Sequence, residues 1–153
     1  MSRFSFIVFI FSLPILGAGC KSAPNSNDTK HPDPTFKSTI NNTAWNTADV
    51  ELSYDEVDSI LFINPKRYPK TDKLNEFEFY IQPYRGVGQY EIAFNANKVI
   101  YWSNEHLFTA RSGHLNIDYE DGQTLAGRFE MDLVDTAHLV LWVRDGNFNL
   151  IRK

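Results

Sequence analysis

Polar and apolar residues alternate in several short segments of the chain. The alternation is clearest in Glu76–Ile81, Gln89–Phe94, His114–Tyr119 and Arg128–Leu133. A period of two residues places the apolar side chains of a segment on one face, which is typical of a β-strand with one buried side. Turns that contain glycine, such as Gly86-Val87-Gly88, separate these segments. The pattern therefore predicts antiparallel strands joined by short turns.

Two further segments near the C-terminus predict a hairpin. Ala137–Arg144 and Asn147–Arg152 are joined by Asp145-Gly146, a dipeptide that suits a type I′ turn because both central residues of that turn need a positive φ. No stretch has a sustained helical period, and Asn104–Leu107 predicts one helical turn at most. Weaker strand patterns cover Thr35–Ile40, Asp49–Tyr54, Ser59–Asn64 and Lys98–Trp102.

The alternating apolar residues predict a single core, because one face of each strand is buried. Trp45 is expected to fill part of this core. We predict an all-β fold: a single antiparallel β-sandwich or partly closed β-barrel of about 8–10 strands. The expected core residues are Phe77, Phe79, Ile81, Tyr90, Ile92, Leu115, Ile117, Phe129, Met131, Leu133, Leu139, Leu141, Val143, Phe148 and Leu150.

The N-terminal residues follow the layout of a secretory signal. Arg3 precedes the apolar run Phe4–Leu16, which is shorter than the ~20 residues of a membrane span, and small residues then lead to Cys20. The next segment is rich in Pro, Ser, Asn and Asp and carries too little apolar surface to fold. We predict a signal peptide (1–19), an acylated N-terminus with a flexible tether (20–35) and one β-domain (36–153).

The segment before Cys20 resembles the lipobox of bacterial lipoproteins. It reads Leu16-Gly17-Ala18-Gly19-Cys20, and Gly17 stands where that pattern usually has leucine. The resemblance implies lipid attachment at Cys20, a membrane partner held through that lipid, and a location in the cell envelope on the outer membrane. The alternative is an ordinary signal peptide cleaved near Ala18-Gly19, which would leave Cys20 free.

Five short motifs resemble, in the same order, motifs of small Bacteroidota lipoproteins whose families are known only as domains of unknown function. Ile40-Asn41-Asn42-Thr43-Ala44-Trp45 resembles their I-N-G-x-x-W opening, with Asn42 in place of the usual glycine. The resemblance implies a β-rich envelope protein and supplies no catalytic residues. The other four motifs lie in Gly88–Ile92, Ser112–Ile117, Leu125–Phe129 and Asp145–Phe148.

Charge and cysteine content narrow the possible partners. The formal net charge is -4 and no basic patch is present, so we expect no nucleic-acid partner. Cys20 is the only cysteine, so the domain must be stable without a disulfide. We also expect no cofactor.

Candidate catalytic and metal-binding patterns are weak. Ser112 and His114 lie two apart on a predicted strand without a nucleophile elbow, and His106, His114 and His138 lack the spacing of a zinc site. Asp118–Gly122 lacks the residue order of a calcium loop. We predict no catalytic residues and no metal ligands. The strand carboxylates expected on the solvent face are Glu76, Glu78, Glu91, Glu130 and Asp132.

Aromatic residues, 14% of the chain, provide the candidate binding surface. Tyr80, Tyr101, Trp102 and Trp142 are candidates for an exposed patch that stacks on a glycan or anchors an envelope protein, and a second small core cluster is the alternative. We therefore predict a non-enzymatic binding or interaction module. Two other functions stay open: a lipocalin-like carrier of a small apolar ligand, and a hydrolase of envelope glycans.

Overall fold

The described part of the chain is built from β-strands. The computed structural model describes residues 35–67, 75–104 and 106–152, which belong to the compact unit His31–Lys153. No helix occurs in these ranges, as the alternating pattern predicts. The predicted signal peptide, Cys20 and the tether through residue 34 lie outside the described residues. The strands are β1 (Thr35–Ile40), β2 (Thr43–Thr47), β3 (Val50–Asp55), β4 (Ile60–Arg67), β5 (Asn75–Ile81), β6 (Gly88–Ala93), β7 (Lys98–Ser103), β8 (His106–Glu120), β9 (Thr124–Val134) and β10 (Val140–Ile151).

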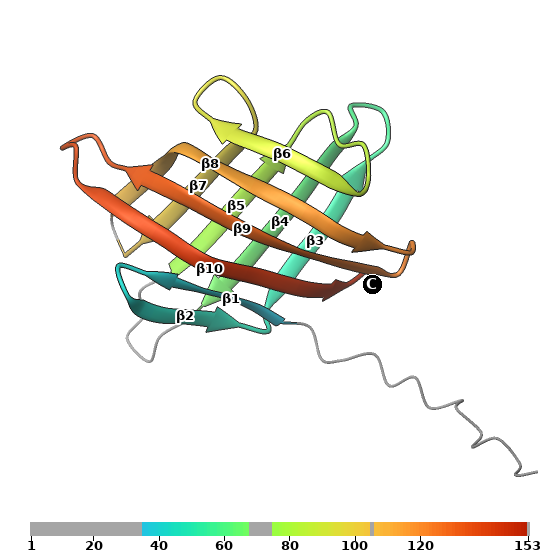
Figure 1. Ribbon diagram of the computed structural model, residues 1–153, viewed down its shortest axis with the longest axis horizontal. Coiled ribbons are helices and arrows are strands. Elements are labelled where there is room, and N and C mark those ends of the chain that lie inside the picture. The colour runs from blue at the N-terminus through green and yellow to red at the C-terminus, as the bar shows by residue number, and fades with distance from the viewer. Residues whose placement is uncertain (1–34, 68–74, 105, 153) are drawn as a thin grey trace, which may run out of the picture. The chain divides into compact units, whose positions relative to one another are not determined.

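These strands form one antiparallel sheet that curves back on itself (Figure 1). The strand order is β2-β1-β10-β9-β8-β7-β5-β4-β3, and β6 pairs with β8 outside this path. Figure 1 shows β8, β9, β10, β1 and β2 crossing in front of β7, β5, β4 and β3. The expectation of a partly closed barrel is confirmed, and its open seam lies between the two end strands, β2 and β3.

Two asparagines make the turn between β1 and β2. Ile40 pairs with Thr43, so Asn41 and Asn42 alone form the turn, with φ angles of 46° and 64°. Both angles are left-handed, a region that asparagine enters more readily than most residues. Asn41 also reaches β10, because its N–H donates to the Trp142 carbonyl (3.0 Å) and its Oδ1 accepts from the Trp142 N–H (2.8 Å). The hairpin therefore forms with asparagine in place of glycine.

β8 changes its partner along its length. Its first half pairs with β7 and its second half with β6, and its register against β9 shifts at Arg111 between these halves. Such a bulge reverses which alternate residues face inward. Phe108 and Ala110 are buried before the bulge, and Leu115 and Ile117 are buried after it. The sequence predicts only the second half of β8 because the alternation breaks at this point.

Two expectations about turns are wrong. Asn104, with a φ of 59°, lies in the tight turn between β7 and β8 and not in a helical turn. Asp145-Gly146 does not reverse the chain, because β10 continues through both residues and pairs with β9 on either side of them. The register shift between Val143 and Gly146 marks a bulge. Asp145 has the expected positive φ (54°), which a bulge accommodates as readily as a hairpin turn.

This bulge aligns two Gly-x-Phe motifs, Gly127–Phe129 of β9 and Gly146–Phe148 of β10. Gly146 of β10 pairs with Phe129 of β9, and Phe148 of β10 pairs with Gly127 of β9. Neither glycine leaves space for a side chain. A Cβ at Gly146 would lie 2.4 Å from the Phe129 carbonyl oxygen and 2.6 Å from the Phe129 ring, and one at Gly127 would lie 2.1 Å from the Asn116 carbonyl oxygen and 2.6 Å from the Phe148 ring. The two strands can therefore approach each other closely where the sheet bends, and both rings pack on its concave side.

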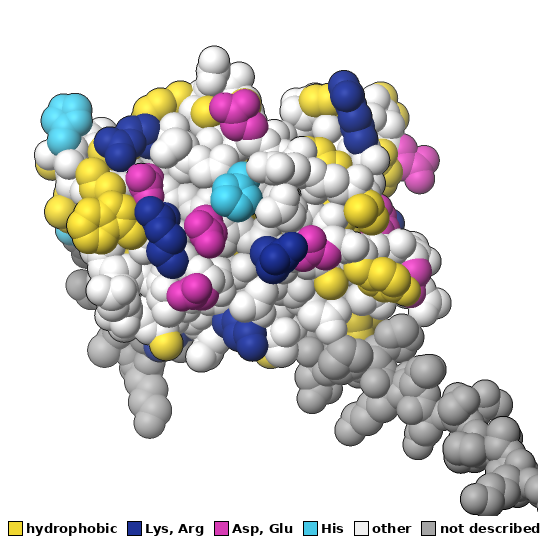
Figure 2. Space-filling view, viewed as in Figure 1, with side chains coloured by type: hydrophobic (Ala, Val, Ile, Leu, Met, Phe, Trp, Pro, Cys, Tyr) yellow, Lys and Arg dark blue, Asp and Glu magenta, His cyan; other side chains and the backbone are white. Residues whose placement is uncertain are grey.

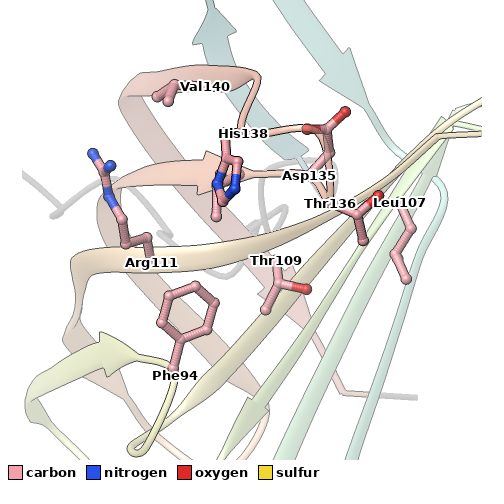
Figure 3. A pocket seen from close by; sticks show the side chains of 9 residues that line it. Phe94, Leu107, Thr109, Arg111, Asp135, Thr136, His138 and Val140 are labelled. Carbon is pink, nitrogen blue, oxygen red and sulfur yellow. The ribbon is translucent and has the colours of Figure 1, made fainter.

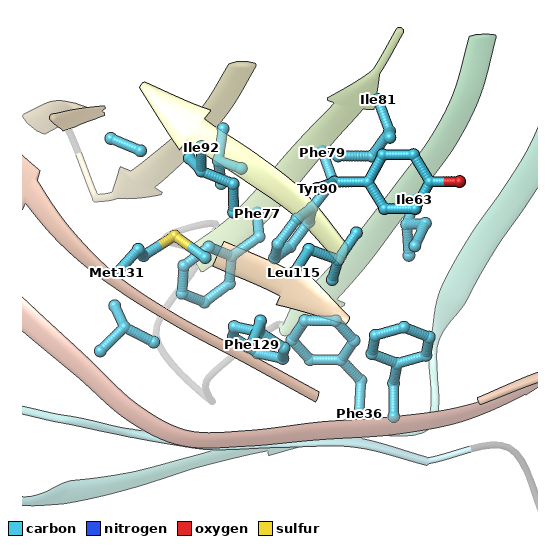
Figure 4. Close-up of a cluster of buried hydrophobic side chains, with 14 of the residues drawn as sticks. Phe36, Ile63, Phe77, Phe79, Ile81, Tyr90, Ile92, Leu115, Phe129 and Met131 are labelled. Atoms are coloured by element: carbon cyan, nitrogen blue, oxygen red, sulfur yellow. The ribbon is translucent and has the colours of Figure 1, made fainter. Parts of the chain in front are cut away.

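Aromatic rings occupy the middle of the interior (Figure 4). Phe36, Phe77, Phe79 and Phe129 are at most 1% exposed, and their ring centroids lie 4.8 to 6.4 Å apart. Trp45, at 4% exposed, packs edge-on against Phe77 as expected of a core residue. Burying each such side chain contributes about 1.5–3 kcal/mol to stability.

The expected core is correct except at the start of β10. Leu139 is 56% exposed and Leu141 is only partly buried, whereas the other residues expected in the core are buried. Leu139 lies before β10 begins at Val140, so the alternation of that strand does not apply to it.

Contacts at both ends of β3 hold the seam. Near its start, the hydroxyl of Thr47 at the end of β2 donates to the carbonyl of Lys66 on β4 (2.6 Å). Near its end, the guanidinium of Arg152 lies 5.9 Å from the ring centre of Tyr54 and forms an ion pair with Glu120. The barrel is thus held together across the seam by side chains in place of a backbone ladder.

Candidate functional site

Tyr80 and Trp102, two of the candidate surface aromatics, lie on the outer face of β5 and β7 and share one carboxylate. Glu78 accepts hydrogen bonds from the Tyr80 hydroxyl (2.8 Å) and the Trp102 Nε1–H (3.3 Å). Two effects raise the pKa of the Tyr80 hydroxyl to about 12. Partial burial is the larger effect, and the hydrogen bond to Glu78 is the second. The Phe62 ring of β4 packs against Tyr80 at 4.9 Å. These residues form a small outer cluster whose polar atoms bond to one another.

Tyr101 lies in the core, which corrects its place among the surface candidates. It is 5% exposed, and its ring stacks on Phe77 with centroids 4.4 Å apart. Neighbouring residues on a strand face opposite sides, so a strand that points Trp102 outward points Tyr101 inward. Burial raises the pKa of the Tyr101 hydroxyl. Tyr101 therefore contributes to the interior and not to an exposed patch.

Trp142 is the most exposed of the four candidates, with 55% of its surface accessible. It lies on β10, opposite Asp132 of β9, with its backbone bonded to Asn41. In the strand order, β8 and β9 separate β10 from β7, which carries Trp102. The candidate aromatics therefore do not form one continuous patch.

A groove opens on the outer surface two residues along β10 from Trp142 (Figure 3). Three segments form it: the loop after β6, the first half of β8, and the turn between β9 and β10. Its volume is about 380 Å³, and its apolar lining consists of Phe94, Leu107, Val134 and Val140. Phe94 is 66% exposed and Leu107 is 42% exposed, so apolar side chains here face solvent. We call this site the outer groove.

Polar side chains complete the walls of the outer groove. Figure 3 shows His138 and Asp135 on the opposite side of the groove from Phe94. Asp135 holds the turn between β9 and β10, because its Oδ1 accepts from the N–H groups of Ala137 (2.9 Å) and Leu139 (2.8 Å). His138 lies in the same turn with a φ of 64°. The polar lining residues are Thr109, Arg111, Asp135, Thr136 and His138.

Arg111 reaches the outer groove from the bulge in β8. Its nearest carboxylate is Asp132, 3.5 Å away, and Arg144 binds the other oxygen of Asp132 at 2.6 Å. Arg144 also donates to the carbonyls of Met131 and Val143, both at 2.9 Å. Two guanidinium groups thus share one carboxylate, and the stronger contact belongs to Arg144. The edge of the groove at Arg111 is therefore positively charged.

The outer groove is not predicted from the sequence. Its residues come from three segments that only the fold brings together, and Arg111 faces the groove because a bulge redirects it. The alternating pattern places Phe94 in the expected strand Gln89–Phe94, and Leu139 and Val140 in the expected strand Ala137–Arg144. Apolar residues are ordinary in strands, so these positions carry no signal of a groove.

The face of β8, β9 and β10 beside the groove is polar and mixed in charge. Figure 2 shows Lys and Arg side chains among Asp and Glu over this face, with hydrophobic side chains gathered at its left and right edges. Arg128 donates two hydrogen bonds to Asp118 (2.8 and 3.1 Å), and these bonds lower the pKa of Asp118. His114 lies opposite Glu130 on the same face. The outer groove is thus an apolar hollow next to a charged surface.

Two kinds of feature are absent from the described residues. Within residues 35–67, 75–104 and 106–152, no three His, Cys, Asp or Glu side chains lie close enough to hold a metal ion. Across the same ranges, no helix is long and apolar enough to cross a membrane. Comparison with protein-family models, with curated proteins and with solved structures finds no match to this chain.

Proposed function

We propose that this chain is an envelope lipoprotein whose β-domain is a non-enzymatic binding module, with the outer groove and Trp142 as its contact surface. The outer groove carries the proposal, because it exposes apolar side chains in a hollow beside a polar face. Exposed apolar surface gathered in a hollow is characteristic of contact sites. The lipobox-like segment before Cys20 and the resemblance to Bacteroidota lipoproteins support the anchored location.

The packed interior favours a surface site over a lipocalin-like carrier. Such a carrier needs space for its ligand inside the barrel. In this barrel the rings of Phe36, Phe77, Phe79 and Phe129 fill the middle of the interior (Figure 4). A ligand held at the outer groove displaces none of these rings.

The placement of the strand carboxylates does not favour a glycan hydrolase. That reaction needs two carboxyl groups that flank one sugar bond. Glu78 is hydrogen-bonded to Tyr80 and Trp102, and Asp132 is paired with Arg144. Both carboxylates are therefore engaged by neighbouring side chains on the outer face.

Site-specific crosslinking in the full chain, expressed in a bacterial envelope, tests the contact surface. A photoreactive amino acid replaces Leu107, Trp142 or, as a control, Tyr119. Tyr119 is 49% exposed, similar to Leu107 (42%) and Trp142 (55%), and lies near the opposite end of β8 from Leu107. Irradiation should give the same mass shift at the first two positions and none at Tyr119. Equal yields at all three positions, or no product at Leu107 and Trp142, would contradict the proposal.

The variant Cys20→Ala tests the anchor. Because the lipid is attached through the thiol, the variant should leave the membrane fraction or keep its signal segment. Fractionation followed by mass measurement of the mature N-terminus distinguishes these outcomes from the wild type. Unchanged membrane partitioning, with a mature mass that differs from the wild type only by the substitution itself, would refute lipid attachment at Cys20.

A further inference from the structure

The size and lining of the outer groove indicate what kind of apolar group fits it. Phe94, Leu107, Val134 and Val140 present only hydrocarbon to the hollow. Its volume of about 380 Å³ leaves room for roughly a dozen groups the size of a water molecule, at ~30 Å³ each. That space suits one short alkyl chain and is too small for the two chains of a membrane lipid.

The charges around the outer groove favour an acidic ligand. Among the described residues that line it, Asp135 is the only carboxylate, and its Oδ1 is bonded to two N–H groups of its own turn. Asp132, beside the groove, is held more closely by Arg144 (2.6 Å) than by Arg111 (3.5 Å). Arg111 is therefore the positive charge that remains for a ligand at this edge of the groove, and its side chain is 50% exposed. A guanidinium can donate to both oxygens of a carboxylate at once.

We propose that the outer groove binds a free single-chain amphiphile with a carboxylate head, its chain over Leu107, Val134 and Val140 and its head paired with Arg111. This inference rests on the proposed binding function and names the ligand class of that site. The chain gains by covering apolar surface that otherwise faces water. The head gains a charge-assisted hydrogen bond that is shorter than the present 3.5 Å contact between Arg111 and Asp132.

Photolabelling of the full chain in nanodiscs of zwitterionic lipid tests the ligand class. The probe is decanoic acid with a diazirine near its methyl end, and the comparison probe is the corresponding alcohol. Mass spectrometry identifies the labelled residues. The acid should label Leu107, Val134 or Val140, and the alcohol should label them about tenfold less, because it lacks the charge that Arg111 binds.

Two arginine variants separate a specific head-group contact from a general effect of charge. Arg111→Gln removes the charge at the groove, whereas Arg128→Gln removes the same charge from the exposed pair with Asp118, outside the groove lining. Labelling by the acid should fall about tenfold in Arg111→Gln and stay unchanged in Arg128→Gln. Labelling by the alcohol should be the same in both variants and the wild type. Both arginines are at least half exposed, so both variants should fold.

Three results would overturn this inference. Equal labelling by acid and alcohol, unaffected by Arg111→Gln, would refute the carboxylate head. Absence of label at Leu107, Val134 and Val140 would refute the site for such a ligand. Labelling that occurs only with anionic lipid in the nanodisc would show that the outer groove contacts the bilayer and not a free amphiphile. If crosslinks from Leu107 and Trp142 still form, only the ligand class is refuted, whereas loss of both signals refutes the proposed function as well.

Discussion

At the scale of single residues, a few left-handed backbone positions control how segments join. Asn41, Asn42, Asn104, His138 and Asp145 have φ angles between 46° and 64°, and each lies in a turn or a bulge. Asparagine, aspartate and histidine enter this region more readily than other non-glycine residues. The sequence therefore indicates where the chain bends. It does not distinguish a turn from a bulge, as Asp145 shows, because both need the same φ.

Replacing Asn41 tests the link between the first hairpin and β10. Asn41→Ala removes the acceptor of the Trp142 N–H and puts alanine in a left-handed conformation. The free energy of unfolding should fall by about 1–3 kcal/mol. Asn42→Gly, in the same turn, keeps the bond from Asn41 to β10. This variant should change the free energy of unfolding by about 1 kcal/mol or less. Urea unfolding measures both, and equal losses would show that the bond from Asn41 contributes nothing.

At the scale of elements, the sequence predicts which face of each strand is buried. It does not predict which strands pair with each other. Alternation reports burial, and it correctly places Phe77, Ile92 and Leu133 in the core. Pairing depends on contacts between distant segments, such as β1 with β10. The alternation breaks at the bulge in β8, but this break does not indicate that the strand passes from β7 to β6, and the outer groove depends on that change of partner. The candidate site is therefore less predictable than the fold.

The paired G-x-F motifs predict a steric coupling between β9 and β10. Gly146→Ala places a methyl group 2.4 Å from the Phe129 carbonyl oxygen and 2.6 Å from the Phe129 ring, so we expect a loss of about 1–3 kcal/mol in the free energy of unfolding. In a Phe129→Leu background the neighbouring side chain is smaller while the contact with the carbonyl remains, so the same substitution should cost less but still destabilise the fold. Unfolding of the two single variants and the double variant gives the coupling energy. Additive losses would mean that the Phe129 ring does not limit the space at Gly146.

At the scale of the whole described domain, four tyrosines tie the free energy of unfolding to alkaline pH. Burial is the main cause of raised hydroxyl pKa values for Tyr80, Tyr84, Tyr90 and Tyr101. Tyr84 also donates to Glu120 (2.7 Å), the carboxylate that pairs with Arg152 near the seam. In the unfolded chain these hydroxyls ionise near pH 10. Between the two pKa values the folded state binds more protons, so a rise in pH favours unfolding.

The stability should therefore be insensitive to tyrosine ionisation below pH 10 and should fall above it. Because the pKa of folded Tyr80 is about 12, its contribution is lost between pH 10 and pH 12. Tyr80→Phe removes the ionising group and should make the fall over this interval shallower. Urea midpoints at several pH values, with absorbance to follow phenolate formation, provide the measurement. A fall of the same steepness in Tyr80→Phe would contradict the assignment to Tyr80.

The open seam also bears on aggregation. A sheet that stops short of closure leaves two rows of unpaired backbone groups, which in other proteins serve as templates for strand addition between copies. Here the end strands are short, with five residues in β2 and six in β3, and β3 carries the charges of Glu51 and Asp55. Two copies that meet would therefore find little edge to pair with. The described domain can then reach high local concentrations without polymerising through its strand edges.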